Sequence, residues 1–180
     1  ETFNLFIPRI VGGGSSEELG KNSSFYKFLV TNGYNNIDAL NIVKNSPTYW
    51  GDQPFVEAPA YIGIAVFFLF VFSVFLYRGK HLVWILSAIF LSLMLSYGKN
   101  LNLLTEFFIN NIPFYNKFRA VASIQVILEL CVPILSIFGL QQLFDSGVSN
   151  KKKLKALTYT FIFFIGILLF LLGVMSSLKF

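Results

Sequence analysis

The chain has 180 residues, of which 55% are hydrophobic and only 13% are charged, and its mean hydropathy is +0.66. About a quarter of the residues of an ordinary soluble domain are charged, so this composition excludes that class and predicts a membrane protein. The formal net charge is +5. Much of it comes from one short cluster of Lys151, Lys152, Lys153 and Lys155. Such clustering indicates membrane topology rather than nucleic-acid binding.

Residues 1–57 contain no apolar stretch long enough to cross a membrane. Glycines and serines at 12–16 predict a flexible break, and two short helices are expected near 24–30 and at 36–43. Asn35 or Asn36 is expected to cap the second helix. One face of that helix is predicted to carry Ile37, Leu40 and Val43. This part is therefore predicted to be a loop-rich, water-facing segment. The chain opens at Glu1 in a polar stretch without a signal peptide, which predicts a fragment of a longer protein.

The remainder, 58–180, is predicted to be a membrane domain. About 20 helical residues cross a hydrocarbon core. Four apolar stretches approach this length, at about 60–77, 82–97, 120–144 and 156–178. Basic loops separate the first pair and the last pair, at 78–81 and 151–155. Because basic loops stay in the cytoplasm, four alternating spans place both loops there and residues 1–57 outside. The predicted protein therefore crosses the membrane several times, with its N-terminal segment outside the cytoplasm.

The stretch between the second and third spans has a different pattern. Apolar residues recur at helical spacing with polar residues between them, namely Leu101, Leu104, Phe107, Phe108 and Ile112. This predicts an amphipathic helix at about 101–112 that lies on the membrane surface. The predicted fold class is therefore all-α: a polytopic membrane helix bundle with about four transmembrane helices, this interfacial helix and the N-terminal segment.

The four-span topology also places residues 98–119 outside, where the topology rule depletes cations, yet three cations lie there. They are Lys99, Lys117 and Arg119, and the last two stand among aromatic residues. Cations and rings at the membrane surface suit a lipid phosphate held beside its acyl chain. The alternative is ordinary snorkelling of long cationic side chains to phospholipid headgroups.

Glu129 is the one acidic residue within the third predicted span, roughly ten residues or about 15 Å from its start. With Gln125 and Ser136 it predicts a polar stripe that faces other helices, because an ionised carboxylate facing lipid is costly. One interpretation is a proton or ligand relay. The other, which we favour, is a protonated or hydrogen-bonded glutamate that ties helices together, since no second ionisable residue accompanies it inside a span.

A short aromatic segment precedes the first span. Tyr49 and Trp50 are followed by Asp52 and Gln53. Rings stack on sugar C–H faces while carboxylates and amides bond hydroxyls, so these residues are candidates for sugar binding. The alternative is a proline-bounded turn with interfacial aromatic residues. Cys131 is the single cysteine, so neither an intrachain disulfide nor a metal-binding spacing is predicted.

Three motifs in this order resemble the bacterial YfhO membrane protein family, particularly its Bacteroidetes-type members. They are Tyr49-Trp50-Gly51-Asp52-Gln53-Pro54-Phe55, Ser96-Tyr97-Gly98-Lys99-Asn100 and Pro113-Phe114-Tyr115-Asn116-Lys117-Phe118-Arg119. The likeness covers most of residues 1–145. The family's proteins are long and polytopic, and their architecture is related to that of GT-C glycosyltransferases, which use polyprenyl-phosphate sugars.

This resemblance implies transfer of a sugar from a polyprenyl-phosphate donor to an envelope polymer or lipid, with Lys117 and Arg119 near the donor's phosphate. It also implies that the essential acid lies in an upstream loop, and Asp52 is only a weak candidate for it. The alternatives are a non-enzymatic lipid or polymer transporter, in which Glu129 would be the functional residue, and a structural membrane subunit. Membrane lipid is the expected partner, and the sequence identifies no cofactor.

Overall fold

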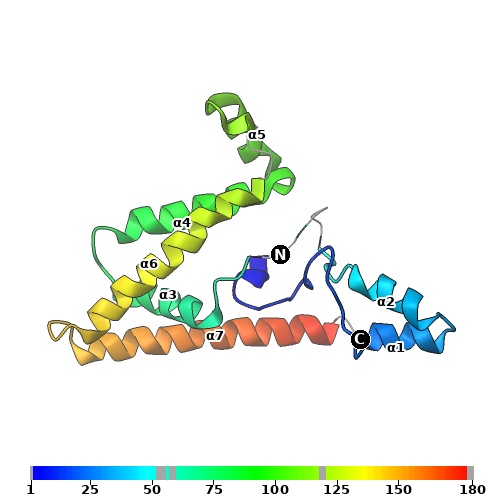
Figure 1. Cartoon of the computed structure of the whole chain (residues 1–180). Coiled ribbons are helices and arrows are strands. Elements are labelled where there is room, and N and C mark those ends of the chain that lie inside the picture. The colour runs from blue at the N-terminus through cyan, green and yellow to red at the C-terminus, as the bar shows by residue number, and fades with distance from the viewer. Residues whose placement is uncertain (1, 52–55, 57–59, 118–120, 178–180) are drawn as a thin grey trace. The chain divides into compact units, whose positions relative to one another are not determined.

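The computed structural model describes residues 2–51, 56, 60–117 and 121–177 (Figure 1). The chain forms two compact units, Glu1–Gly63 and Ile64–Phe180. The boundary lies six residues beyond the predicted one at residue 57. Within the described ranges the secondary structure is helical, apart from one isolated β-bridge.

The first unit contains the two short helices expected from the sequence, α1 (Ser24–Thr31) and α2 (Asn36–Lys44). Ser23 caps α1, because its side-chain oxygen accepts a hydrogen bond from the amide of Tyr26 at 3.1 Å. Asn35 occupies the cap position of α2 without a side-chain bond. The two helices share a small core of Leu29, Ala39 and Val43.

The predicted apolar face of α2 is wrong in one residue. Ala39 and Val43 are fully buried, whereas 66% of the Ile37 surface is exposed. Residues four apart lie on one side of a helix, so the buried pair defines the contact with α1. Ile37 lies off that contact because α1 is the only helix of this unit that packs on α2 within the described residues.

Main-chain hydrogen bonds join the beginning of the first unit to its end. The amide of Glu17 donates to the carbonyl of Ser46 at 3.0 Å, and the amide of Ser46 donates back to the carbonyl of Glu17 at 3.1 Å. The amide of Trp50 donates to the carbonyl of Val11 at 3.1 Å. These bonds hold the aromatic segment in place against residues 29 and 39 positions earlier in the chain.

Side chains reinforce this connection around Glu17. Its carboxylate accepts a short hydrogen bond from the Thr48 hydroxyl and a second from the Arg9 guanidinium, whose nitrogen lies 2.6 Å away. The Thr48 bond, and after it the bond and charge of Arg9, lower the pKa of Glu17 from its usual value. A lowered pKa means that the folded state favours the ionised carboxylate. This contribution to stability is present above the ordinary pKa and is lost as pH falls through the lowered one.

We therefore expect an acid-induced loosening of the aromatic segment below about pH 4.5, the ordinary value for glutamate. The fluorescence of Trp50 in a Trp84→Phe background reports this change, because the Trp50 amide belongs to the same connection. Glu17→Gln should abolish the transition, since the amide cannot titrate, whereas Glu18→Gln should keep it. An unchanged acid transition in Glu17→Gln would contradict this account of the contact.

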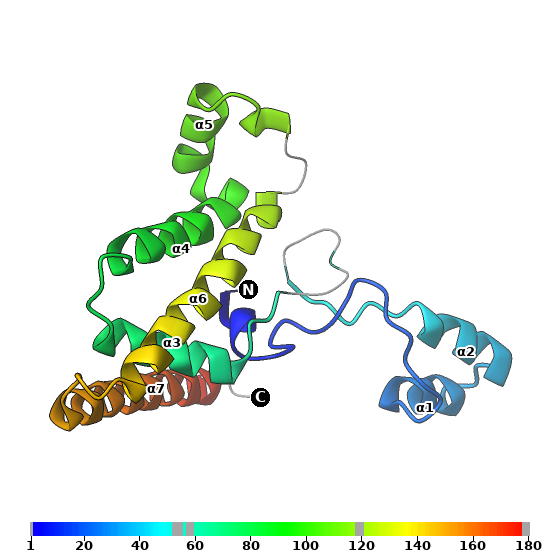
Figure 2. The ribbon, with the colours of Figure 1, turned by 60° about the vertical axis from the view of Figure 1, so that its left-hand side comes forward.

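The second unit is built on four apolar helices (Figures 1 and 2). Their bounds are α3 (Ile64–Leu76), α4 (Leu82–Ser96), α6 (Gln125–Phe144) and α7 (Asn150–Ser177). Helix α6 packs against both α3 and α4, and α7 packs along α3. In both views the yellow α6 crosses the two earlier helices while the orange-to-red α7 runs beside α3.

Small residues allow α3 and α6 to approach each other closely. The hydroxyl of Ser136 donates to the carbonyl of Val66 at 3.1 Å, and Ser73 and Ser136 are both buried. Gly139 faces Ser73 so closely that an added Cβ would lie 1.8 Å from the Ser73 hydroxyl oxygen and 2.8 Å from its Cα. In an apolar solvent, helices associate through such close packing and interhelical hydrogen bonds rather than through hydrophobic burial.

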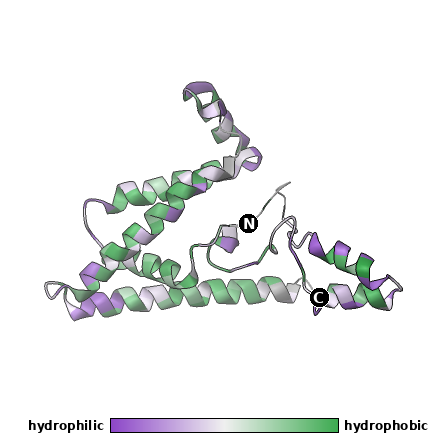
Figure 3. Ribbon diagram, viewed as in Figure 1, coloured by the Kyte–Doolittle hydropathy of each residue, from purple (hydrophilic) through white to green (hydrophobic). Residues whose placement is uncertain are grey.

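Among the described residues of this unit, two helices are long and apolar enough to cross a membrane, α6 and the Asn150–Val174 part of α7. Helix α4 passes the same test only when it is joined to the bent segment that follows it, which would make three. Helix α3 is apolar but has only 13 residues. Figure 3 shows α7 as hydrophilic at its beginning and hydrophobic along most of its length.

The structure corrects two predicted boundaries. The lysines at 151–155 are not a loop but the first turns of α7, which is consistent with the good helix propensity of lysine. Helix α3 begins at Ile64 rather than 60, because residues just before it bond to the start of the chain. The Asn4 side-chain amide donates to the carbonyl of Ala60 at 3.0 Å, and the Ile62 amide donates to the carbonyl of Leu5 at 2.9 Å.

Candidate functional site

The candidate site is the segment between α4 and α6, which begins with a sharp bend. A short 3₁₀ helix, Gly98–Leu101, follows α4 and leads into α5 (Asn102–Asn111). The chain turns by 110° between α4 and this segment. The buried hydroxyl of Thr105 donates to the carbonyl of Gly98 at 3.0 Å and holds the bend. If α4 runs along the membrane normal, α5 lies close to the membrane plane.

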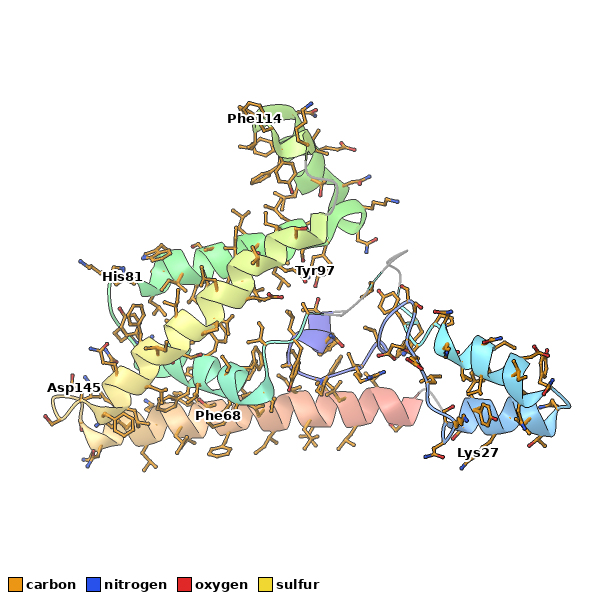
Figure 4. All side chains as sticks on the ribbon, viewed as in Figure 1. Lys27, Phe68, His81, Tyr97, Phe114 and Asp145 are labelled. Carbon is orange, nitrogen blue, oxygen red and sulfur yellow. The ribbon has the colours of Figure 1, made fainter. Side chains whose placement is uncertain are left out.

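The α5 segment exposes large apolar side chains. Leu103 and Phe114 are 85% and 77% exposed, and more than half of Phe107 is exposed. The ring of Phe108 lies 5.5 Å from the ring of Tyr115, so an aromatic contact joins α5 to the turn that follows it. Figure 4 shows Phe114 at the end of this segment that is far from α4. Exposed apolar residues among polar ones are typical of a helix that lies in a membrane interface.

The structure describes two of the three predicted phosphate-binding cations. Lys99 is exposed in the 3₁₀ helix before α5, and Lys117 is exposed in a second one, Tyr115–Lys117, after it. They lie at opposite ends of a helix of 10 residues, about 15 Å long, and so do not form one compact site. Arg119 lies outside the described residues. The amide of Lys117 donates to the carbonyl of Phe114 at 2.9 Å, so the two residues belong to the same tight turn.

The predicted sugar-binding residues lie in the first unit. Trp50 is 72% exposed and Tyr49 is half-buried. Asp52 and Gln53 lie outside the described residues, so the structure gives the aromatic half of this motif alone. The indole ring of Trp50 lies next to the chain at Gly12, where an added Cβ would be 3.0 Å from the ring. A planar ring held on a fixed backbone can stack on a sugar face.

Glu129 differs from its prediction in two ways. Helix α6 begins at Gln125, because residues Val121–Ile124 form a 3₁₀ turn, so Glu129 lies only about 6 Å from the start of the helix. Its side chain is exposed, whereas Ser136 is buried against α3 and Gln125 is half-buried. The predicted stripe therefore does not face one neighbour, and the described helices do not cover Glu129.

Two further features of the structure, a contact around Glu17 and a groove beside Lys153, were not predicted from the sequence. The contact of Glu17 with Arg9 and Thr48 depends on tertiary structure that spacing does not predict. A groove beside Lys153 is formed by three helices. Within the described ranges, no three histidine, cysteine, aspartate or glutamate residues are grouped so that they could hold a metal ion.

No known protein-family model matches the chain, and comparisons with curated proteins and with solved structures found no match.

Proposed function

We propose that the chain belongs to a multi-pass protein of the bacterial cytoplasmic membrane that transfers a sugar from a polyprenyl-phosphate donor to an envelope polymer or lipid. The N-terminal segment would lie outside the cytoplasm, and α3, α4, α6 and α7 would be four spans. The proposal combines the family resemblance of the sequence with the exposed rings and cations of the α5 segment.

The observation that carries this proposal is the pairing of exposed rings with exposed cations after a sharp bend. Phe107 and Phe114 can enter the acyl region, while Lys117 remains at the headgroup level where a phosphate would lie. A donor with a lipid tail and a phosphate needs both environments within one short segment. The α5 segment supplies both.

In the proposed reaction, the acceptor hydroxyl attacks the anomeric carbon of the sugar, and the bond from that carbon to the phosphate oxygen breaks. The leaving polyprenyl phosphate takes the bonding electron pair, and the hydroxyl proton passes to a carboxylate base. Lys117 and Arg119 would stabilise the negative charge that grows on the phosphate. The carboxylate is not assigned, although Asp52 stays a weak candidate on the resemblance alone.

The test compares Arg119→Lys with Arg119→Ala in the full-length protein at matched membrane abundance. A bidentate guanidinium–phosphate contact cannot be replaced by a single ammonium. Losing it should cost about 1.5–3 kcal/mol, or roughly tenfold or more in transfer rate, in both variants. Lys27→Ala, which removes an exposed cation of the first unit, is the control. Normal transfer by both Arg119 variants would leave generic headgroup contact as the role of this segment.

The four-span orientation has its own expected result. In a Cys131→Ser background, Lys21→Cys should react with a membrane-impermeant thiol reagent in intact cells, because residue 21 is exposed in the segment proposed to lie outside. Lys151→Cys should react only after permeabilisation, since the basic start of α7 is retained in the cytoplasm. Labelling of residue 151 in intact cells would reverse the proposed orientation.

A further inference from the structure

A groove lies where α6 ends and α7 begins. Its volume is about 420 Å³, and its walls come from α3, α6 and the first turns of α7. The wall residues are mainly apolar and include Phe68, Phe72 and Leu154. The polar residues are Asn150 and Lys153, both from the beginning of α7. One end of an otherwise apolar groove is therefore polar and cationic.

The length of the groove suits part of an acyl chain. The groove extends from Asn150 to Leu157, which corresponds to about 10 Å along α7. One leaflet contributes about 15 Å to a hydrocarbon core of about 30 Å. A groove of this length, lined mainly by apolar side chains, has room for part of one hydrocarbon chain.

The cations beside the groove are available to an anion. Lys153 is half-buried and donates one hydrogen bond, at 2.8 Å, to the main-chain carbonyl of Asp145. An ammonium has three donors, so two remain. The Asp145 carboxylate accepts from the amide of Gly147 at 2.8 Å, and Figure 4 shows Asp145 at the turn between α6 and α7. In the part of the chain that the structure describes, no ion pair joins a lysine of the 151–155 stretch to a carboxylate.

We propose that this groove binds one anionic phospholipid, with part of an acyl chain against Phe68 and Phe72 and its phosphate on Lys153. Charge complementarity favours this occupant, because Lys151, Lys152 and Lys155 add to the positive field while Asp145 is the single acid of the 145–155 stretch. Basic pockets between membrane helices are a recurring way to hold anionic headgroups. The site is separate from the α5 segment and does not require the chain to transfer sugar.

The test uses the full chain in detergent and native mass spectrometry, with phosphatidylglycerol and phosphatidylcholine of identical acyl chains as probes. The wild-type chain should bind the first phosphatidylglycerol more tightly than the first phosphatidylcholine. Lys153→Met retains the aliphatic stem and should reduce that preference about fivefold, which corresponds to about 1 kcal/mol for one lysine near an anionic headgroup. Lys151→Met removes the same charge from an exposed residue outside the groove and should change the preference less than twofold.

A second pair of variants tests the acyl half of the site. Leu154→Trp places a larger side chain at the groove wall and should reduce binding of the first lipid of either type. Leu168→Trp is the control, since Leu168 is also exposed on α7 but does not line the groove. Equal losses in Lys151→Met and Lys153→Met would overturn the proposal in favour of a diffuse basic surface. Wild-type lipid binding by Leu154→Trp would overturn the groove as the site, and absence of any phosphatidylglycerol preference in the wild-type chain would overturn an anionic phospholipid as the occupant.

Discussion

Gly139→Ala is expected to destabilise the packing of α3 against α6 by about 1–3 kcal/mol, the usual cost of overpacking a well-packed interior. The new methyl group would lie 2.5 Å from the Ser73 Cβ and 2.8 Å from the Ser73 Cα. The Cα belongs to the backbone, so a side-chain rotation cannot relieve the contact and the helices must separate. Separation also weakens the bond from the Ser136 hydroxyl to the Val66 carbonyl. The measurement is the reversible unfolding free energy of the full chain in lipid bicelles.

The control for Gly139→Ala lies in α7. A Cβ added at Gly166 would meet nothing within 4 Å, so Gly166→Ala should be neutral or should stabilise its helix by up to about 1 kcal/mol. Ser73→Gly, combined with Gly139→Ala, should restore part of the stability because it removes the Ser73 hydroxyl and Cβ. Equal stability of the two single variants would show that α3 and α6 do not approach closely at this level.

Gly12→Ala is expected to have the largest effect in the first unit. Gly12 has a φ of 86°, which costs a residue with a Cβ about 1–2 kcal/mol. An added Cβ would also lie 1.8 Å from the main-chain oxygen of Thr48. The Thr48 oxygen and its carbonyl carbon belong to the backbone, so the segment that carries Trp50 must move. Hydrogen exchange of the full chain should show faster exchange at the amides of Thr48 and Trp50, which donate to residues of the Gly12 region.

Gly33 provides a matched control for the conformational part of that effect. Its φ is 89°, and an added Cβ would meet nothing within 4 Å. Gly33→Ala should therefore have the strain of the positive φ without the collision, and faster exchange should stay near the turn between α1 and α2. If both variants leave the amides at 48–50 equally protected, the close approach of Gly12 to Thr48 is absent in solution.

Sequence reasoning predicted the helices whose limits depend on local signals. Helices α1 and α2 match the predicted ranges except that each extends one residue further. The agreement is close because Ser23 and Asn35 mark the starts of the helices and apolar periodicity gives their lengths. The expected helix at 101–112 corresponds to α5, Asn102–Asn111. The limits of these three helices depend on residues close to them in the sequence, so a short stretch of sequence is enough to predict them.

Features that depend on contacts between residues far apart in the sequence could not be predicted from local patterns. An apolar stretch indicates a helix, but the start of α3 depends on a hydrogen bond between Ile62 and Leu5. In a hydropathy pattern, Ser73 and Gly139 are only less apolar positions within two apolar stretches, and the pattern does not reveal that they face each other. At the candidate site, the sequence indicated the cations, the rings and the helix between Lys99 and Lys117, but it did not reveal the 110° bend between α4 and the α5 segment.

The shortness of α3 and α4 has a consequence for the surrounding bilayer. Their 13 and 15 residues give lengths of about 20 and 22 Å, against a hydrocarbon core of about 30 Å. In the proposed four-span arrangement both helices adjoin α6, whose 20 residues match the core. In that arrangement the hydrophobic mismatch would draw the leaflets together beside α3 and α4, at a cost of a fraction of a kcal/mol for each ångström. Lipids with short acyl chains reduce that cost, so the protein is expected to partition into the thinner regions of a membrane.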